Sequence, residues 1–209
     1  MQVWAGVTLI IGSILFMIAA FMPISMRVFD PSLSARDQIA IVEEDRGQWL
    51  FSSALFGAGG LIAAAGLLLF ARHVQGLGLE TFTGNLAVTA AIVAAIGAVF
   101  WTIVSYLRFT RTPEEIFIEG AISGGWLFPA YTVMTQLALI AIGYVLIQSG
   151  YPAWLGWGMI VLVSLTIVGL ILFRDMPPFV HYVWTLVMGI TILLSNASQV
   201  VTAASGAAQ

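Results

Sequence analysis

The chain of 209 residues contains no cysteine and no lysine, and only 8% of its residues are charged. Without cysteine it has no disulfide, no thiolate nucleophile and no cysteine ligand for zinc or an iron–sulfur cluster. Without lysine it can form neither a Schiff base with retinal or pyridoxal phosphate nor a Walker phosphate-binding loop. A soluble domain has about a quarter of its residues charged. The low charge therefore excludes a soluble enzyme, a disordered tail and a nucleic-acid-binding protein.

Long apolar stretches dominate what is present. Hydrophobic residues make up 60% of the sequence, and the mean hydropathy is +1.02. A helix needs about 20 mostly apolar residues to cross the hydrocarbon core of a bilayer. Six stretches meet this requirement and contain no acidic residue, lysine or arginine: 3–22, 49–70, 86–107, 126–147, 154–173 and 179–200. Because the apolar runs are continuous and do not alternate, they favour transmembrane helices over transmembrane strands.

The sequence therefore predicts a single domain over residues 1–209, an all-α integral membrane bundle of six transmembrane helices. We expect the first stretch to be retained, because no basic residue precedes it and no small-x-small cleavage site follows Met22. An even number of spans places both termini on one side of the membrane. Six of the seven arginines lie in the loops on the other side, 23–48, 108–125 and 174–178. The positive-inside rule then predicts cytoplasmic loops and termini outside.

Two of these arginine-rich loops contain helix-capping patterns. Segments 34–37 (Ser-Ala-Arg-Asp) and 112–115 (Thr-Pro-Glu-Glu) each place a hydroxyl three residues before a carboxylate. Such a pair satisfies free backbone N–H groups at the start of a helix. We expect one or two short interfacial helices on the side of the membrane opposite the termini, with residues 116–118 against the lipid.

Small residues recur at every fourth position in the second and third stretches, between Ser53 and Gly66 and between Ala87 and Ala98. In lipid, small residues let two helices approach closely. We therefore expect the second and third helices to cross in contact. The segment from Gly57 to Gly66 also suits a dimer of two chains, and this alternative stays open.

Polar side chains inside a membrane are costly, which makes them candidate functional groups. Gln136 lies near the middle of the fourth stretch, with Tyr131 on a neighbouring stripe of the same helix. His181 opens the sixth stretch, and an arginine follows the third and the fifth. These residues form a candidate ligand-binding site on the arginine-rich side: Arg108, Tyr131, Gln136, Arg174 and His181.

Each candidate also has a structural interpretation. Arginine at the end of a span commonly extends to water along its apolar stem, and tryptophan at the start of the next span lies among the headgroups. Gln136 can serve hydrogen bonding between helices, which we favour over a polar cavity. His181 can bond Asp175 or a lipid headgroup at the interface, and we favour this over a proton relay.

The absence of a mid-span charge, a metal-ligand cluster and a nucleophile motif favours a non-catalytic polytopic membrane protein. It would be an accessory or structural subunit, or a small membrane bundle of another role. The alternative is a carrier or binding protein for a small apolar or lipid-like ligand, with its pocket on the arginine-rich side. The sequence indicates no particular cofactor and no metal. The expected partners are the lipid bilayer and a protein in a membrane complex, not nucleic acid.

Overall fold

The computed structural model of the chain describes residues 1–30, 32–120, 126–173 and 179–206, with the backbone alone for residue 173 and for 196–206. All regular structure in these ranges is helical. The helices are α1 (Gln2–Phe21), α2 (Pro23–Val28), α3 (Ala35–Glu44), α4 (Arg46–Gln75), α5 (Thr81–Thr110), α6 (Pro113–Phe117), α7 (Leu127–Gln148), α8 (Ala153–Phe173) and α9 (Val180–Gly206).

Five of these helices are long and apolar enough to cross a membrane: α1, α4, α5, α7 and α8. In α9 the apolar part with described side chains is shorter, Val180–Ser195. Each of the six apolar stretches falls on one of the six long helices. The predicted helical membrane bundle is therefore confirmed, whereas the side of the membrane that each end faces stays a prediction.

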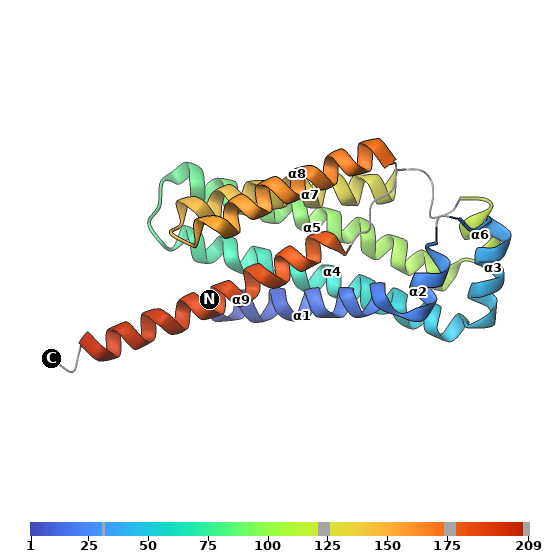
Figure 1. Cartoon of the computed structure of the whole chain (residues 1–209), viewed down its shortest axis with the longest axis horizontal. Helices are drawn as coiled ribbons and strands as arrows, with labels where there is room; N and C mark the ends of the chain where they lie inside the picture. The colour runs from blue at the N-terminus through green and yellow to red at the C-terminus, as the bar shows by residue number, and fades with distance from the viewer. Residues whose placement is uncertain (31, 121–125, 174–178, 207–209) are drawn as a thin grey trace.

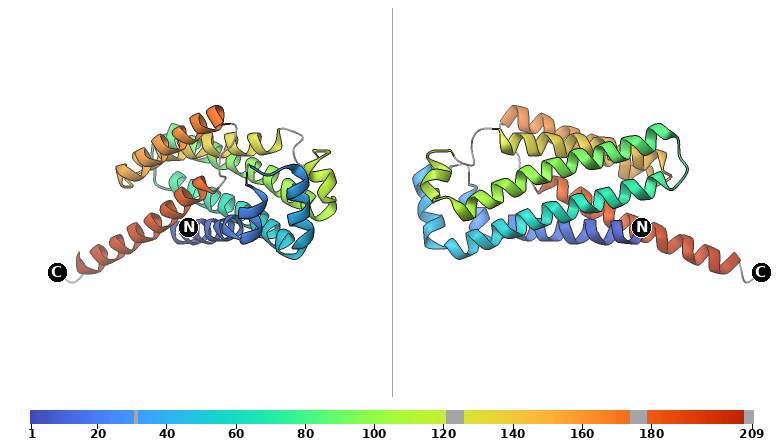
Figure 2. Two further views of the ribbon diagram at one scale, coloured as in Figure 1. Left: turned by 45° about the vertical axis from the view of Figure 1, so that its right-hand side comes forward. Right: turned by 180° about the vertical axis from the view of Figure 1, so that it is seen from behind.

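The bundle is elongated and has two different ends. Figure 1 shows both termini at one end and the three short helices α2, α3 and α6 at the other. We call these the terminal end and the cap end. The long helices follow one neighbour order, in which α9 packs on α1, α1 on α4, α4 on α5, α5 on α7 and α7 on α8. Figure 2 shows that α9 diverges from α8 toward the C-terminus, and α9 meets α7 and α8 only narrowly.

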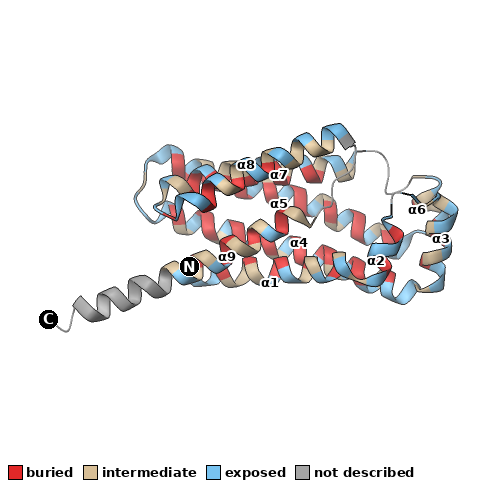
Figure 3. Cartoon of the chain, in the orientation of Figure 1, coloured by how far each residue is buried: buried red, intermediate tan, exposed pale blue. Residues whose placement is uncertain are grey.

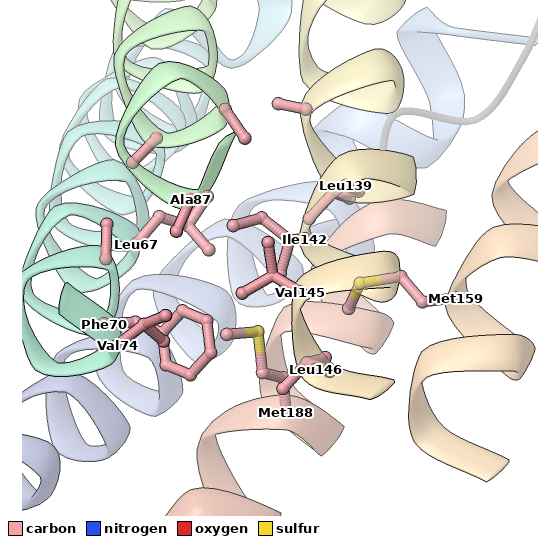
Figure 4. Close-up of a cluster of buried hydrophobic side chains, with 14 of the residues drawn as sticks. Leu67, Phe70, Val74, Ala87, Leu139, Ile142, Val145, Leu146, Met159 and Met188 are labelled. Carbon is pink, nitrogen blue, oxygen red and sulfur yellow. The ribbon is translucent and has the colours of Figure 1, made fainter. Parts of the chain in front are cut away.

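The interior of the described chain has three hydrophobic clusters, one of which lies among α2, α3 and the start of α4, and Figure 3 shows buried residues along the inward faces of the long helices. The largest cluster is mainly aliphatic and lies toward the terminal end, where Leu67 of α4, Leu139 of α7 and Met188 of α9 belong to it (Figure 4). The second cluster lies toward the cap end and is mainly aromatic. It contains Phe16, Phe56, Trp101, Tyr131 and Tyr182.

Glycine permits a very close crossing between α1 and α4. Gly12 lies against the backbone of Gly59 and Ala63. A Cβ atom on Gly59 would stand 2.7 Å from the backbone nitrogen of Phe16, which is closer than real Cβ atoms come. The two helices could therefore not keep this distance with a larger residue at either glycine.

The predicted contact between α4 and α5 is also confirmed, since the two helices pack along their lengths and Gly57 faces Ser105. The small residues of α4 do not all face α5, however, because Gly59 and Gly66 lie against α1. All four glycines from Gly57 to Gly66 are buried within one chain. These glycines therefore pack within one chain, whereas a dimer face on the exposed side of this segment stays a prediction.

Both predicted capping boxes are present at the cap end. The Ser34 hydroxyl accepts the backbone N–H of Asp37, whose carboxylate accepts the backbone N–H of Ser34. Thr112 and Glu115 pair in the same way at the start of α6. The short helix α2, which has a proline in its first turn, was not predicted from the sequence.

The expectation that residues 116–118 face lipid is wrong for two of the three. Ile116 is buried, and the ring of Phe117 lies 6.0 Å from that of Trp49. Only Ile118 is exposed. The short helix α6 therefore packs its apolar side onto the protein.

Replacing Gly12 with alanine should destabilise the protein, because the new methyl group overlaps the backbone of α4. Overpacking of this kind costs about 1–3 kcal/mol, and thermal unfolding in detergent, followed by circular dichroism, measures it. Gly47→Ala is the matched control, since nothing lies within 4 Å of a Cβ atom there. Equal unfolding temperatures for Gly12→Ala and the wild type would contradict the close crossing.

Replacing Ser34 with alanine should raise the pKa of Asp37. Hydrogen bonds from the hydroxyl and the backbone N–H of Ser34 hold that pKa below its ordinary value. A carboxylate with a lowered pKa stabilises the folded cap above its ordinary pKa, and this contribution is lost as the pH falls through the lowered value. An NMR titration measures the pKa values of Asp37 and Asp30. Asp30 serves as the internal control, because hydrogen bonds from Ser32 lower its pKa independently of Ser34. An unchanged Asp37 titration in Ser34→Ala would refute the capping role.

Candidate functional site

Arg108 lies two residues before the end of α5, a helix of 30 residues. A helix of this length spans about 45 Å, which matches the thickness of a bilayer with its headgroup regions, about 40–45 Å. The length of α5 therefore predicts headgroup depth for Arg108, where an arginine ordinarily extends into water. Its side chain turns inward instead, and the residue is only 4% exposed. The interpretation of Arg108 as an arginine that extends to water is wrong.

Four aromatic rings surround the Arg108 guanidinium. Its Cζ atom lies 4.5 Å from the ring centroid of Trp49, 5.3 Å from Phe29, 5.6 Å from Trp101 and 5.7 Å from Phe56. These distances are typical of cation–π interactions. The rings come from α4, α5 and the residue that ends α2. We call Arg108 and these four rings the Arg108 cage.

The Arg108 cage is rich in hydrogen-bond donors that lack an acceptor within the described part of the chain. Two guanidinium nitrogens, Nε and Nη1, are buried and unpaired, and so are the indole nitrogens of Trp49 and Trp101. The Ser105 hydroxyl, one turn before Arg108, is in the same state. A buried polar group without a partner costs about 1–3 kcal/mol, and a charged one costs more. The cage is therefore short of acceptors.

No carboxylate in the described ranges pairs with Arg108. The ion pairs of that part of the chain lie elsewhere, between Arg27 and Glu44 at 2.6 Å and between Arg111 and Glu115 at 3.2 Å. None of the described acidic residues is buried. Within these ranges, the four aromatic rings are therefore the recorded contacts of this cation.

A second polar group lies where α7 meets α9. The Tyr131 hydroxyl is 2.8 Å from Nε2 of His181 and donates to the hydroxyl of Tyr182 over 3.1 Å. All three side chains are buried. His181 therefore bonds inside the protein and not to a headgroup.

Trp101 joins the two polar groups into one cluster. Its ring belongs to the Arg108 cage and also stacks on Tyr131, with centroids 4.9 Å apart and planes 27° from parallel. On the other side of the cluster, Phe16 of α1 stacks on Tyr182 at 3.7 Å. Residues from α1, α4, α5, α7 and α9 thus converge in the half of the bundle nearer the cap end.

A small cavity of about 20 Å³ lies beneath the Tyr131–His181 pair. Small residues of α4 and α5 form one side of it, and polar side chains of α7 and α9 form the other, among them Thr135 and Thr185. A space of this size holds one water molecule. A larger ligand can reach these residues only if side chains or helices move.

The remaining predicted site residues differ in their positions. Gln136 is fully buried, and neither atom of its amide group has a partner in the described part of the chain. Thr132 and Thr135 on the same helix are also buried and unpaired. The interhelical hydrogen bond expected of Gln136 is therefore not made there. Arg174 lies outside the described residues, as does Asp175.

Among the described residues, no group of three or more histidine, aspartate or glutamate side chains could hold a metal ion. No family model, no curated protein and no solved structure matches this chain.

The structure brings three of the five predicted site residues into one cluster, Arg108, Tyr131 and His181. Trp49 and Trp101 are not among the site residues predicted from the sequence. The position of Trp49 at the start of a span predicts only a tryptophan at headgroup level. Trp101 gave no signal, because nearly all of its neighbours in the chain are apolar and nothing marks the inward face of the helix.

Replacing Tyr131 with phenylalanine should destabilise the protein, because His181 and Tyr182 both lose their shared partner inside the bundle. The expected loss is about 1–3 kcal/mol in the free energy of unfolding, measured by thermal denaturation in detergent. Tyr106→Phe is the matched control, since Tyr106 is 64% exposed. Identical unfolding temperatures for the two variants would show that the hydrogen bonds of Tyr131 contribute nothing.

Proposed function

We propose that this membrane protein binds a small amphipathic, lipid-like ligand in the cap-end half of the bundle, as a carrier or binding protein. The observation that carries the proposal is Arg108, a buried cation with two unpaired nitrogens and no described acid beside it. Buried charges in proteins are paired with a partner or a ligand. The expected binding residues are Arg108, Tyr131, Gln136, Arg174 and His181.

The depth of Arg108 supports a ligand with a polar head and an apolar body. The guanidinium is predicted at headgroup depth, and the aromatic rings of Trp101, Phe56 and Phe16 continue from it toward the centre of the bundle. A head at Arg108 would leave the apolar body beside these rings. An amphipathic ligand therefore suits the order of polar and apolar groups along the helices.

The narrow contact of α9 with α7 and α8 supports entry from the lipid. α9 packs mainly on α1, so a small movement of α9 away from α7 breaks few contacts. His181 and Tyr182 lie at the start of α9 and Tyr131 lies on α7. Opening this seam would expose the cluster to molecules dissolved in the bilayer.

An accessory subunit is the second candidate. This candidate is supported by the exposure of α8. Only 22% of the most apolar part of α8 is buried, whereas 39–56% of that part is buried in the other four long apolar helices. Large apolar side chains such as Leu165 and Ile171 are exposed on it. Lipid covers such a surface as well as a protein partner does. We therefore favour ligand binding, since lipid alone does not account for the buried cation.

A lipid extract should stabilise the purified protein against heat, because a ligand that binds only the folded state raises the unfolding temperature. Arg108→Ala should abolish this stabilisation and Gln136→Ala should reduce it. Arg111→Ala is the matched control, since Arg111 lies at the same end of the bundle and is exposed. No stabilisation by any extract, or an equal one in Arg108→Ala, would rule out ligand binding at this cluster.

A further inference from the structure

We propose that the Arg108 cage binds an oxyanion, the carboxylate or phosphate head of a single-chain amphipathic molecule. This inference rests on the function proposed above and names the chemistry of the ligand head. It is carried by the unpaired buried donors of Arg108, Trp49, Trp101 and Ser105. The two indole rings lie 4.5 Å and 5.6 Å from Cζ of Arg108, and Ser105 lies one turn before Arg108 on α5.

Aromatic rings and hydrogen-bond acceptors satisfy different parts of a guanidinium. A ring attracts the cation through its π-face, whereas the N–H bonds radiate in the plane of the guanidinium and need acceptor atoms. Four rings around Arg108 meet the first requirement. The second is unmet at Nε and Nη1. An oxygen of a carboxylate or phosphate group is the kind of charged acceptor that each of these N–H groups lacks.

The groups beside Arg108 select a head made of acceptors. The indoles of Trp49 and Trp101 can only donate, and the Ser105 hydroxyl can donate as well. A carboxylate or a fully ionised phosphate group accepts from all of them without bringing a proton of its own. An alcohol or an amide brings a further donor into a place that has few acceptors. The donor set therefore fits an acceptor-only head.

The charge of Arg108 favours an anion over a neutral acceptor such as a carbonyl group. Removing a cation from water is costly, and an anion in contact compensates this cost most fully. None of the acidic residues in the described ranges is buried near Arg108. The ligand head is thus expected to supply the missing negative charge.

The test uses the purified full chain in a neutral detergent and three probes with the same alkyl chain: palmitate, hexadecyl phosphate and hexadecanol. Thermal unfolding should shift upward with palmitate, with hexadecyl phosphate or with both, and should not shift with hexadecanol. The anion that gives the larger shift identifies the source of the head as a carboxylate or a phosphate. Acetate and inorganic phosphate, added alone, test whether the head suffices without a tail.

Arg108→Met removes the charge and keeps an unbranched apolar side chain. Its affinity for the anionic probe should be about tenfold or more weaker, as expected for the loss of a charge-assisted hydrogen bond. Arg111→Ala should bind like the wild type. Without a probe, Arg108→Met should unfold at the wild-type temperature or above it, because an uncompensated buried charge has been replaced by an apolar group. The variant therefore stays folded and testable.

Three outcomes would overturn the inference. Equal shifts with hexadecanol and the anions would assign a neutral ligand head and leave the proposed function standing. No shift with any probe, while a lipid extract still stabilises the protein through Arg108, would assign another head chemistry. A large loss of stability in both Arg108→Met and Asp175→Asn without a probe would show that the Asp175 carboxylate, and not a ligand, compensates the charge of Arg108. If the lipid extract fails as well, the proposed function fails with the inference.

Discussion

A cation that is buried away from water needs interactions inside the protein that compensate its lost hydration. This requirement determines the packing at the cap end of the bundle. Arg108 is predicted at headgroup depth, so water is the ordinary destination of its side chain. Its inward orientation costs several kcal/mol of solvation, and four cation–π contacts of about 0.5–2 kcal/mol each offset much of that cost. The same rings leave the N–H groups without acceptors. The rings therefore stabilise the buried cation, and its unpaired N–H groups can still donate to an acceptor.

Small residues on α4 explain why aromatic side chains from separate helices meet there. Gly59 lets α1 approach, which brings Phe16 against Phe56 and Tyr182. A Cβ atom on Gly60 would lie 3.3 Å from the Tyr182 hydroxyl and 3.8 Å from the Trp101 ring. The space that these glycines leave is therefore filled by aromatic residues of other helices. The stripe of small residues in the sequence thus serves the site as well as the close packing of the helices.

The fold was predictable because its signals are local. A run of about 20 apolar residues defines a span without reference to any other segment, and a capping box lies within four residues. Arg108 was chosen as a candidate from its place at the end of a span, but its inward orientation was not predictable. That orientation depends on contacts with Phe29 and Trp49, which are far from Arg108 in the sequence. The helix α2 was missed because Pro23 also fits a linker.

Trp101 makes the two polar groups of the cluster physically dependent on each other. One ring contacts the Arg108 guanidinium and stacks on Tyr131, whose hydroxyl binds His181 and Tyr182. Packed rings in a dense interior cannot shift singly, because each fills space that the next requires. The hydrogen bonds between α7 and α9 lie at the seam where we propose ligand entry. In the proposed complex, Trp101 is the contact through which a head bound at Arg108 would affect Tyr131 and this seam.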